Sequence, residues 1–309
     1  MKNLLIVLLG PTGVGKTDLS IDIARLFKCE IISADSRQFY REMRIGTSVP
    51  TESQLAEIKH HFIRFISVKD YYSASLFERD VLNLLQVLFA KRNVALMTGG
   101  SGMYIDAVCD GIDDIPDIEP SVREKIKRKY EKEGAEGLRL ALKLLDPAYY
   151  KQVDLKNPKR LIRALEICES TGLPYSSFLT NLKRKRDFEI LKIGLNRTRE
   201  DLYCRINNRV DKMMEEGLEK EAGSLFEFRS LNALNCVGYK ELFSYFEGKT
   251  SREGAVNLIK RDTRRFAKRQ MTWWKKDKSI TWSDPEELHA VTELIGNRLY
   301  SMSGSARSL

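Results

Sequence analysis

Gly10-Pro11-Thr12-Gly13-Val14-Gly15-Lys16-Thr17 lies between the apolar run Leu4–Leu9 and Asp18–Phe27, whose apolar residues recur at helical spacing. The pattern GxxxxGK[ST] between a strand and a helix is the P-loop, whose glycines let backbone N–H groups turn around an anion. Lys16 adds a positive charge, and the Thr17 hydroxyl can hold Mg²⁺. The sequence therefore predicts a pyrophosphate-binding loop directly after a buried parallel strand.

Strand and helix signals alternate over the first hundred residues. We expect strands at Glu30–Ala34, Phe62–Ile66 and Val94–Thr98, and a helix at Ala74–Lys91. Alternation of this kind predicts an α/β fold, in which helices cover a parallel sheet, as in the cores of P-loop NTPases.

The pattern changes after this part of the chain. Residues 113–120 are rich in Asp and Pro and indicate a linker, and only helical signals follow until the strand expected at Glu189–Leu195. We therefore predict a P-loop catalytic core over residues 1–115 and 187–309, with an all-helical insertion domain over 116–186. Further helices are expected at Thr198–Gly217, Lys240–Gly248 and Glu253–Lys276.

Composition narrows the class of protein. The chain has 309 residues, with 52 Lys and Arg against 43 Asp and Glu, a formal charge of +9 that favours a polyanionic partner without proving one. The five cysteines are scattered without a CxxC pair and there are three histidines, so we expect a reducing cytoplasm and neither disulfides nor structural zinc. No apolar run approaches the roughly 18 residues that span a membrane, and we expect no membrane association.

One acidic residue stands near the predicted phosphate site. An ordinary P-loop NTPase has an acid at the end of a second strand, but Val94–Thr98 is followed by Gly99 and Gly100. Asp35 instead follows the strand Glu30–Ala34, and the carboxyl ends of parallel strands share one edge of the sheet. Its position alone leaves three roles open, namely a Mg²⁺ ligand, a helix cap or a catalytic base.

A basic helix is the strongest signal for a nucleic-acid partner. Arg261, Arg265 and Lys268 recur on one face of Glu253–Lys276, and the Trp273-Trp274 pair offers planes on which bases could stack. Ala255, Ile259, Phe266 and Trp273 are expected to pack on the other face. The alternative is an ordinary solvated surface, which is what most charge runs form.

Taken together, these segments resemble the tRNA dimethylallyltransferases, also called tRNA isopentenyltransferases. The resemblance runs from about Leu4 to Trp282, with Ser101 and Met103 standing where Thr and Leu are more usual in the family. The matching pieces, in the order of the family, are Gly10–Thr17, Asp35–Gln38, Ile45–Thr47, Thr98–Tyr104, Pro158–Glu166, Asn207–Val210, Cys236–Glu241 and Lys268–Trp274.

The resemblance implies transfer of a dimethylallyl group from its diphosphate to the exocyclic amine of the adenosine 3′-adjacent to the anticodon, within the tRNA anticodon stem-loop. Asp35 then becomes the general base, and Mg²⁺ at Thr17 would assist the leaving pyrophosphate. Arg209 matches the family's pyrophosphate-binding arginine, with Arg205 one turn away as the alternate. We expect a monomer. The competing readings are a nucleoside or small-molecule kinase and an RNA-binding NTPase without group transfer.

The family's tRNA contacts carry over to several segments of this chain. By resemblance they are Asp35, Ser36, Arg37, Gln38, Ser101, Arg123, Lys159, Arg160, Leu161, Ile162, Arg163, Cys236, Val237, Gly238, Tyr239, Lys240, Lys268, Arg269, Gln270 and Trp273. Leu161 and Ile162 also fit the core of a helix, and Arg123 also fits a plain surface charge.

Overall fold

The structure is a computed structural model that describes residues 2–116, 118–180 and 182–304. It consists of two compact units, a core of residues 1–110 and 185–309, and an insertion of residues 111–184. The insertion therefore begins and ends a few residues earlier than the 116–186 expected from the sequence. Within the described residues, no helix combines the length and the apolar character needed to cross a membrane.

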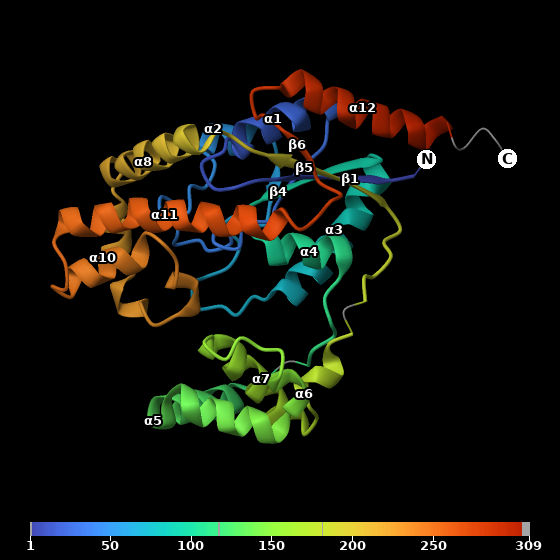
Figure 1. The fold of residues 1–309 in the computed structure, drawn as a ribbon. Helices are drawn as coiled ribbons and strands as arrows, with labels where there is room; N and C mark the ends of the chain where they lie inside the picture. Colours follow the sequence, from blue (N-terminus) through green and yellow to red (C-terminus); the bar gives the residue numbers. More distant parts are fainter. Residues whose placement is uncertain (1, 117, 181, 305–309) are drawn as a thin grey trace. The chain divides into compact units, whose positions relative to one another are not determined.

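A parallel six-stranded sheet forms the centre of the core, in the order β3-β2-β4-β1-β5-β6 (Figure 1). The strands are β1 (Leu4–Leu9), β2 (Ile31–Ser33), β3 (His60–His61), β4 (Val94–Gly99), β5 (Glu189–Leu195) and β6 (Thr281–Ser283). The central strand β1 pairs with β4 on one side and β5 on the other, so the insertion interrupts the chain between two neighbours of the same strand. The predicted α/β class is confirmed.

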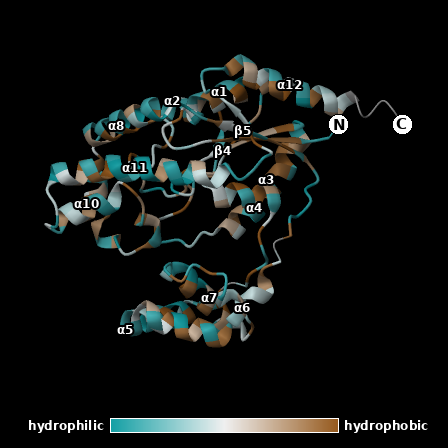
Figure 2. Cartoon of the chain, viewed as in Figure 1, coloured by the Kyte–Doolittle hydropathy of each residue, from teal (hydrophilic) through white to brown (hydrophobic). Residues whose placement is uncertain are grey.

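Both faces of the sheet are covered by helices, because alternate residues of β1 point to opposite sides. Leu4, Ile6 and Leu8 pack in the cluster that includes α1 (Lys16–Phe27) and α12 (Leu288–Gly304). The intervening residues of β1 pack with α3 (Ala74–Lys91) and α4 (Gly102–Asp110). Figure 1 shows these two helix pairs on opposite sides of the strands, and Figure 2 shows long hydrophobic stretches in α3.

One predicted strand is wrong. Phe62–Ile66 does not form a strand, since Phe62 and Arg64 have left-handed backbones with φ of 61° and 51°. Such angles break an extended ladder, and only Ile66 makes an isolated bridge, to Tyr40. The edge strand lies just before, at His60–His61. The sequence also gave no sign of α2 (Glu52–Glu57), α4, α9 (Leu218–Ser224), β6 or α12.

The C-terminal part of the core contributes a further layer of helices. It contains α8 (Arg199–Glu215), α9, α10 (Tyr239–Phe246) and α11 (Arg252–Trp274). Along α11, Ile259 packs in the cluster of α9 and α10, Ala267 joins the α1 cluster and Trp274 joins the α3 cluster. One helix therefore contributes to three hydrophobic clusters, and Figure 2 shows hydrophilic stretches along it.

The insertion is all-helical in its described residues and has its own hydrophobic core, formed by residues such as Leu138, Leu142 and Leu165. Its elements are α5 (Pro120–Leu145), α6 (Pro147–Tyr150), α7 (Pro158–Thr171) and the 3₁₀ turn η1 (Tyr175–Phe178). Gly134 kinks α5 with φ of 65°. The buried Asp146 carboxylate accepts hydrogen bonds from the amides of Tyr149 and Ser176, at 2.9 and 2.6 Å, and so fixes η1 to α6.

Candidate active site

The P-loop connects β1 to α1 as the sequence predicts. Gly15 has φ of 112°, a left-handed conformation that favours glycine, and the helix begins at the next residue. The Lys16 ammonium donates to the carbonyls of Gly10 and Pro11 at 2.8 and 3.0 Å. Burial lowers the pKa of Lys16 to about 8, although Asp35 opposes this shift.

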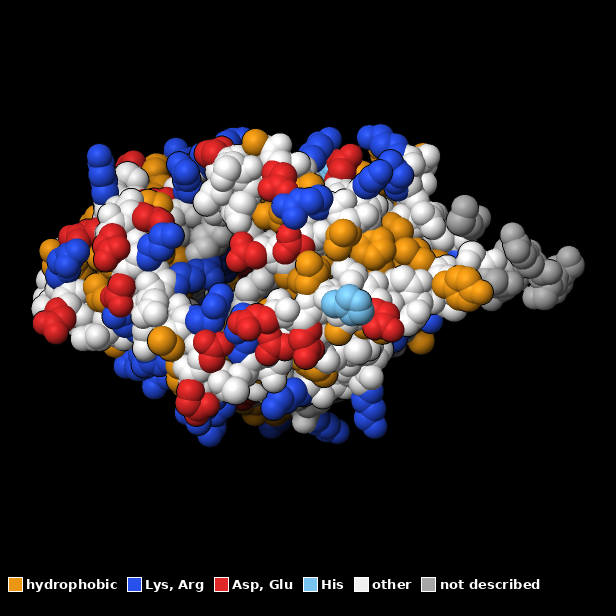
Figure 3. Space-filling model, turned by 90° about the horizontal axis from the view of Figure 1, so that it is seen from above, with side chains coloured by type: hydrophobic (Ala, Val, Ile, Leu, Met, Phe, Trp, Pro, Cys, Tyr) orange, Lys and Arg blue, Asp and Glu red, His pale blue; other side chains and the backbone are white. Residues whose placement is uncertain are grey.

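A cavity of about 400 Å³ opens beside the loop, and we call it the P-loop cavity. Its lining includes Gly13, Lys16, Thr17, Arg205 and Asn208. The basic side chains come from α1 and α8, and the lining is mainly polar, as a phosphate site requires. Seen from the side of α1 and α12, the surface has a hollow around which Lys and Arg side chains gather (Figure 3).

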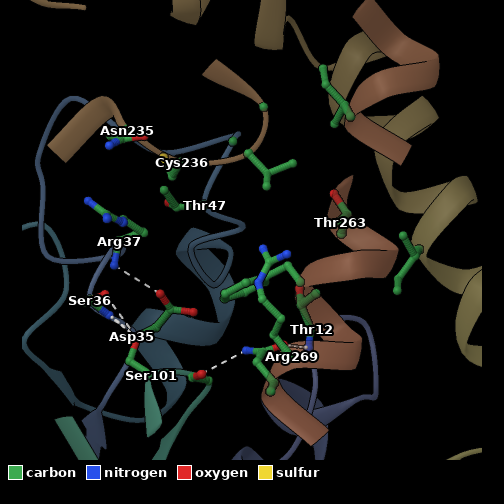
Figure 4. A pocket seen from close by; sticks show the side chains of 18 of the residues that line it. Thr12, Asp35, Ser36, Arg37, Thr47, Ser101, Asn235, Cys236, Thr263 and Arg269 are labelled. Carbon is green, nitrogen blue, oxygen red and sulfur yellow. Dashed lines mark hydrogen bonds between the residues drawn. The ribbon is translucent and has the colours of Figure 1, made fainter. Parts of the chain in front are cut away.

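A second cavity of about 460 Å³, which we call the wide cavity, has a large apolar wall. Ile206, Val210 and Met213 of α8 form this wall with Ile259 and Phe266 of α11. Figure 4 shows the opposite sides of the wide cavity, with Asp35, Ser36 and Ser101 facing Thr263 and Arg269. An apolar group and a flat ring could both be enclosed here.

The two cavities share five lining residues, which are Thr12, Asp35, Gly100, Arg209 and Gln270. The Asp35 Oδ1 atom accepts from the amide of Arg37 at 3.0 Å. Asp35 therefore caps a turn at residues 36–39, and its carboxylate stands where the polar and apolar spaces meet. The capping role and a role in chemistry are compatible, because a carboxylate has two oxygen atoms.

Both candidate arginines of α8 reach the P-loop. Arg209 lines both cavities; its Nε donates to Ser48 Oγ at 2.6 Å and its Nη1 to Thr12 Oγ1 at 3.3 Å. Burial lowers the pKa of Arg209, and Asp35 opposes that shift. Arg205 lines only the P-loop cavity, and its Nε donates to the Gly13 carbonyl at 3.1 Å. Arg209 is therefore the arginine at the junction.

Three of the residues expected to contact tRNA have largely buried side chains. Gln270 accepts from the Thr12 amide at 2.9 Å and donates to the Gly100 carbonyl at 2.8 Å, which ties α11 to the P-loop. Tyr239 is fully buried, and Leu161 is fully buried in the core of the insertion. The Thr12 amide, which we expected to face phosphate, is thus used by Gln270.

Other predicted contacts in the core lie on or near the wide cavity. Ser101 Oγ accepts from the Ser36 amide at 3.0 Å, which joins two of them. Arg37 donates through Nη1 to the carbonyls of Asn232 and Ala233, both at 2.9 Å. The wide cavity is also lined by Cys236, Val237, Gly238, Lys240, Arg269 and Trp273. Gln38 lines the P-loop cavity, and Lys268 is exposed on α11.

The remaining predicted contacts belong to the insertion. Lys159 and Arg160 are exposed at the start of α7. Arg163 lies 3.8 Å from the Glu166 carboxylate, while Ile162 is half-buried against the hydrophobic core of this unit. Arg123 is half-buried on α5. The insertion therefore presents a basic end of α7 to solvent.

The α11 basic face, which we define as Arg261, Arg265 and Lys268, is exposed as predicted, but Asp262 pairs with both arginines. The packing expected for the other face is partly wrong. Ala255 and Ile259 are buried, whereas Phe266 and Trp273 are 38% and 47% exposed and line the wide cavity. Trp274 is the buried tryptophan. The Trp273 indole donates to Asp106 at 2.8 Å.

Several residues at the site were missed by sequence reasoning. Arg197 donates to the Val14 carbonyl at 2.9 Å, and Ser48 holds Arg209. Glu221 accepts from three backbone amides of a loop that lines the wide cavity. Each of these contacts joins residues more than 150 positions apart, so no local motif could reveal it.

The fold and the two cavities define a P-loop enzyme core, in which an anion-binding pocket continues into a pocket for a larger organic group. Comparison with known proteins identifies the class more closely. The IPP transferase family profile matches residues 38–277. A tRNA dimethylallyltransferase of Phocaeicola vulgatus is 52% identical over 96% of this chain and 98% of its own. A tRNA dimethylallyltransferase of Porphyromonas gingivalis is 55% identical over 91% of this chain and 94% of its own.

Solved structures agree. A tRNA isopentenylpyrophosphate transferase from Bacillus halodurans superposes with a TM-score of 0.72 at 32% identity, covering 99% of both chains. A eukaryotic dimethylallyltransferase acting on tRNA gives a TM-score of 0.79 at 26% identity, covering 99% of this chain and 80% of its own. The chain belongs to the IPP transferase family of tRNA dimethylallyltransferases, and these relatives favour the transferase over the kinase alternative.

Proposed function

We propose that this protein transfers a dimethylallyl group from dimethylallyl diphosphate to the exocyclic amine of the adenosine 3′-adjacent to the anticodon of tRNA, releasing pyrophosphate. One observation carries the proposal beyond family membership. Asp35 stands at the junction of a polar cavity with P-loop and arginine donors and a cavity with a large apolar wall. A diphosphate ester of a small hydrocarbon needs these two environments side by side.

The P-loop cavity would hold the diphosphate. Lys16 and Arg209 supply positive charge there, and Arg209 can grip two phosphate oxygens through its guanidinium. Negative charge grows on the pyrophosphate as its bond to the hydrocarbon breaks, so donors fixed in advance lower the barrier. The dimethylallyl group would lie against the apolar wall of α8 and α11.

The adenine would enter the wide cavity and present its amine to Asp35. The amine nitrogen forms a bond to the first carbon of the dimethylallyl group, and the carbon–oxygen bond to pyrophosphate breaks with its electron pair. Asp35 accepts the proton that the nitrogen loses, which matters because the adenine lone pair is delocalised and weakly nucleophilic. The base must leave its stack to reach this position.

Residues of the P-loop cavity fit Mg²⁺. The Thr17 hydroxyl lines it, and Mg²⁺ prefers such oxygen ligands together with phosphate oxygens and water. When bound, the ion would neutralise charge on the diphosphate. The described residues contain no group of three His, Cys, Asp or Glu side chains that could hold a metal by themselves. This supports an ion held mainly through the diphosphate.

Both units would take part in binding the anticodon stem-loop. In the core, Asp35–Arg37, Ser101, Cys236–Gly238, Lys240 and the end of α11 line the wide cavity, and Gln38 lines the P-loop cavity. The insertion offers Arg123, Lys159, Arg160 and Arg163. We assign Tyr239 and Leu161 to the scaffold behind these contacts, because their side chains are buried, and keep Gln270 as a proposed contact, because it lines both cavities. The protein would act as a monomer, which gel filtration with light scattering tests.

A single assay tests the proposed activity. The purified protein is incubated with dimethylallyl diphosphate and unmodified tRNA, the tRNA is digested, and its nucleosides are weighed by mass spectrometry. We expect a dimethylallyl adduct on adenosine, formed without ATP. A parallel reaction with ATP in place of the prenyl donor distinguishes the kinase, and a tRNA with another base at that position is the control for the site. If dimethylallyl diphosphate and unmodified tRNA give no adduct, the proposed transferase activity is refuted.

A further inference from the structure

One surface loop touches both cavities although none of its residues belongs to the P-loop. Gly46 and Thr47 line the wide cavity and Ser48 lines the P-loop cavity. The loop Arg44–Ser48, which we call the donor loop, thus borders the space for the diphosphate and the space for the organic group. Its conformation bears directly on the geometry between them.

A single carboxylate fixes the start of the donor loop. Glu221 of α9 accepts hydrogen bonds from the amides of Arg44, Ile45 and Gly46 at 2.9, 2.8 and 3.0 Å. Three successive amides pointing at one anion form a nest, an arrangement that elsewhere captures phosphate. Here the protein fills the nest with its own side chain.

The fully buried Tyr239 completes this arrangement. Its hydroxyl donates to Glu221 Oε1 at 2.6 Å, and its ring lies against the backbone of Gly46. A Cβ atom at Gly46 would come within 2.7 Å of that ring, so no larger residue fits there without movement. Glu221 therefore binds the start of the donor loop, and Tyr239 in turn holds the Glu221 carboxylate in place.

The other end of the donor loop meets the arginine at the junction. Ser48 has φ of 50°, a conformation that residues other than glycine rarely adopt. Gln38 holds this turn by donating to the carbonyls of Thr47 and Ser48 at 3.2 and 3.0 Å. The turn directs Ser48 Oγ to Arg209 Nε, 2.6 Å away. A guanidinium has five donors, so others remain for a ligand.

We propose that Glu221 and Ser48 are positioning residues, with Glu221 fixing the donor loop so that Ser48 holds the Arg209 guanidinium in register with the diphosphate. The proposal rests on the proposed function, since Arg209 must serve the leaving pyrophosphate. It gives a role in the reaction to residues that lie outside both the P-loop and the basic helix. Substitutions here should alter the rate of transfer more than the affinity for tRNA.

The test is a double-mutant cycle in single-turnover rates, with dimethylallyl diphosphate and tRNA both saturating. Ser48→Ala and Ser48→Gly should each slow the reaction by about 10–100-fold, the usual effect of losing one hydrogen bond to a charged group. On an Arg209→Ala background the same changes should add less than about twofold, because Ser48 would act through Arg209. Glu221→Gln should slow the wild type similarly, and Tyr239→Phe less.

Matched controls separate positioning from folding. Ser53→Ala removes an exposed hydroxyl on α2, and Glu219→Gln changes a carboxylate of α9 that pairs with Arg252 at the surface. Both should react at the wild-type rate. The glycine variant relieves the left-handed turn, so it serves if the alanine variant folds poorly.

Three outcomes would overturn the inference. In the first, Ser48→Ala and Ser48→Gly both react within twofold of wild type while Arg209→Ala is slow. Ser48→Gly could restore the rate lost in Ser48→Ala, which would trace the loss to backbone strain and not to the hydroxyl. The loss could also persist at full size without Arg209. If instead Arg209→Ala itself reacts normally, the proposed role of Arg209 fails first, and the dependence on Ser48 fails with it.

Discussion

The cations of the P-loop cavity differ from those of the α11 basic face in how the protein holds them. Lys16 donates to two carbonyls of its own loop, and Arg209 donates to the hydroxyls of Ser48 and Thr12. On α11, Arg261 and Arg265 instead share one carboxylate, Asp262, in the open. Charges that are held in place can stabilise a transition state at one point. Exposed charges on flexible side chains mainly add to the field that attracts a polyanion.

The largest effect is expected from Asp35, a charged residue that lines the P-loop cavity together with the fixed cations. We expect Asp35→Ala to reduce the rate by about 10²–10⁴-fold, the usual contribution of a general base, with tRNA affinity nearly intact. Single-turnover kinetics and a binding assay measure the two quantities separately. Asp35→Asn is the control, because it keeps the turn that Asp35 caps while removing the base. A rate for Asp35→Ala within threefold of wild type rules out this role.

Arg209 should come next. Without Arg209 we expect the rate at saturation to fall by about 10²–10³-fold, by analogy with the loss of one oxyanion donor, while the salt dependence of tRNA binding stays unchanged. Lys at this position should recover only part of the rate, since it cannot bind two oxygens in parallel. Arg205→Ala is the matched control one turn away on α8. A larger loss for Arg205→Ala than for Arg209→Ala would exchange the two assignments.

The same contrast explains how far the sequence could be read. The P-loop, β5 and α11 can be predicted from local sequence, through a motif, an apolar run and helical spacing respectively. The structure has all three where predicted. The position of Asp35 in the cavity beside the P-loop followed from a general property of parallel sheets. Such features depend on neighbours in the chain or on rules of the fold.

What the sequence could not give are contacts between distant segments. Nothing near Gln270 indicates that its amide joins α11 to the P-loop, and the basic residues around it favour a surface role instead. Likewise, Trp273 and Trp274 are equivalent by composition, and only the packing of α11 decides which one is buried. The strand expected at Phe62–Ile66 failed because left-handed turns at Phe62 and Arg64 are not visible in an aromatic, β-prone stretch.

The pKa of Lys16 offers a third, smaller test. Burial lowers that pKa to about 8, so the cation predominates below pH 8 and the neutral amine above it. A bound diphosphate favours the cation and raises the pKa, so binding above pH 8 must take up a proton. We expect the affinity for dimethylallyl diphosphate, measured by calorimetry without tRNA, to fall by up to about tenfold per pH unit above pH 8. Lys16→Arg should bind with little change over this range, because a guanidinium stays charged; equal pH dependence in both proteins contradicts the assignment.

The smallest effect is expected from the α11 basic face, and it should appear in salt dependence. Each phosphate contact contributes about −0.7 to −0.9 to the slope of log K against log salt, so replacing Arg261, Arg265 and Lys268 by Ala should flatten the slope by at most about 2–3. The loss should be smaller than three full contacts, because Asp262 already neutralises part of the charge on both arginines. For the same reason, Asp262→Asn should steepen the slope.

The matched control replaces Lys2, Lys59 and Lys91, which are 61–68% exposed and precede β1, β3 and β4, at the edge of the sheet opposite the cavities. Equal changes in the two triple variants would mean that tRNA responds only to net charge, and that α11 presents an ordinary solvated surface.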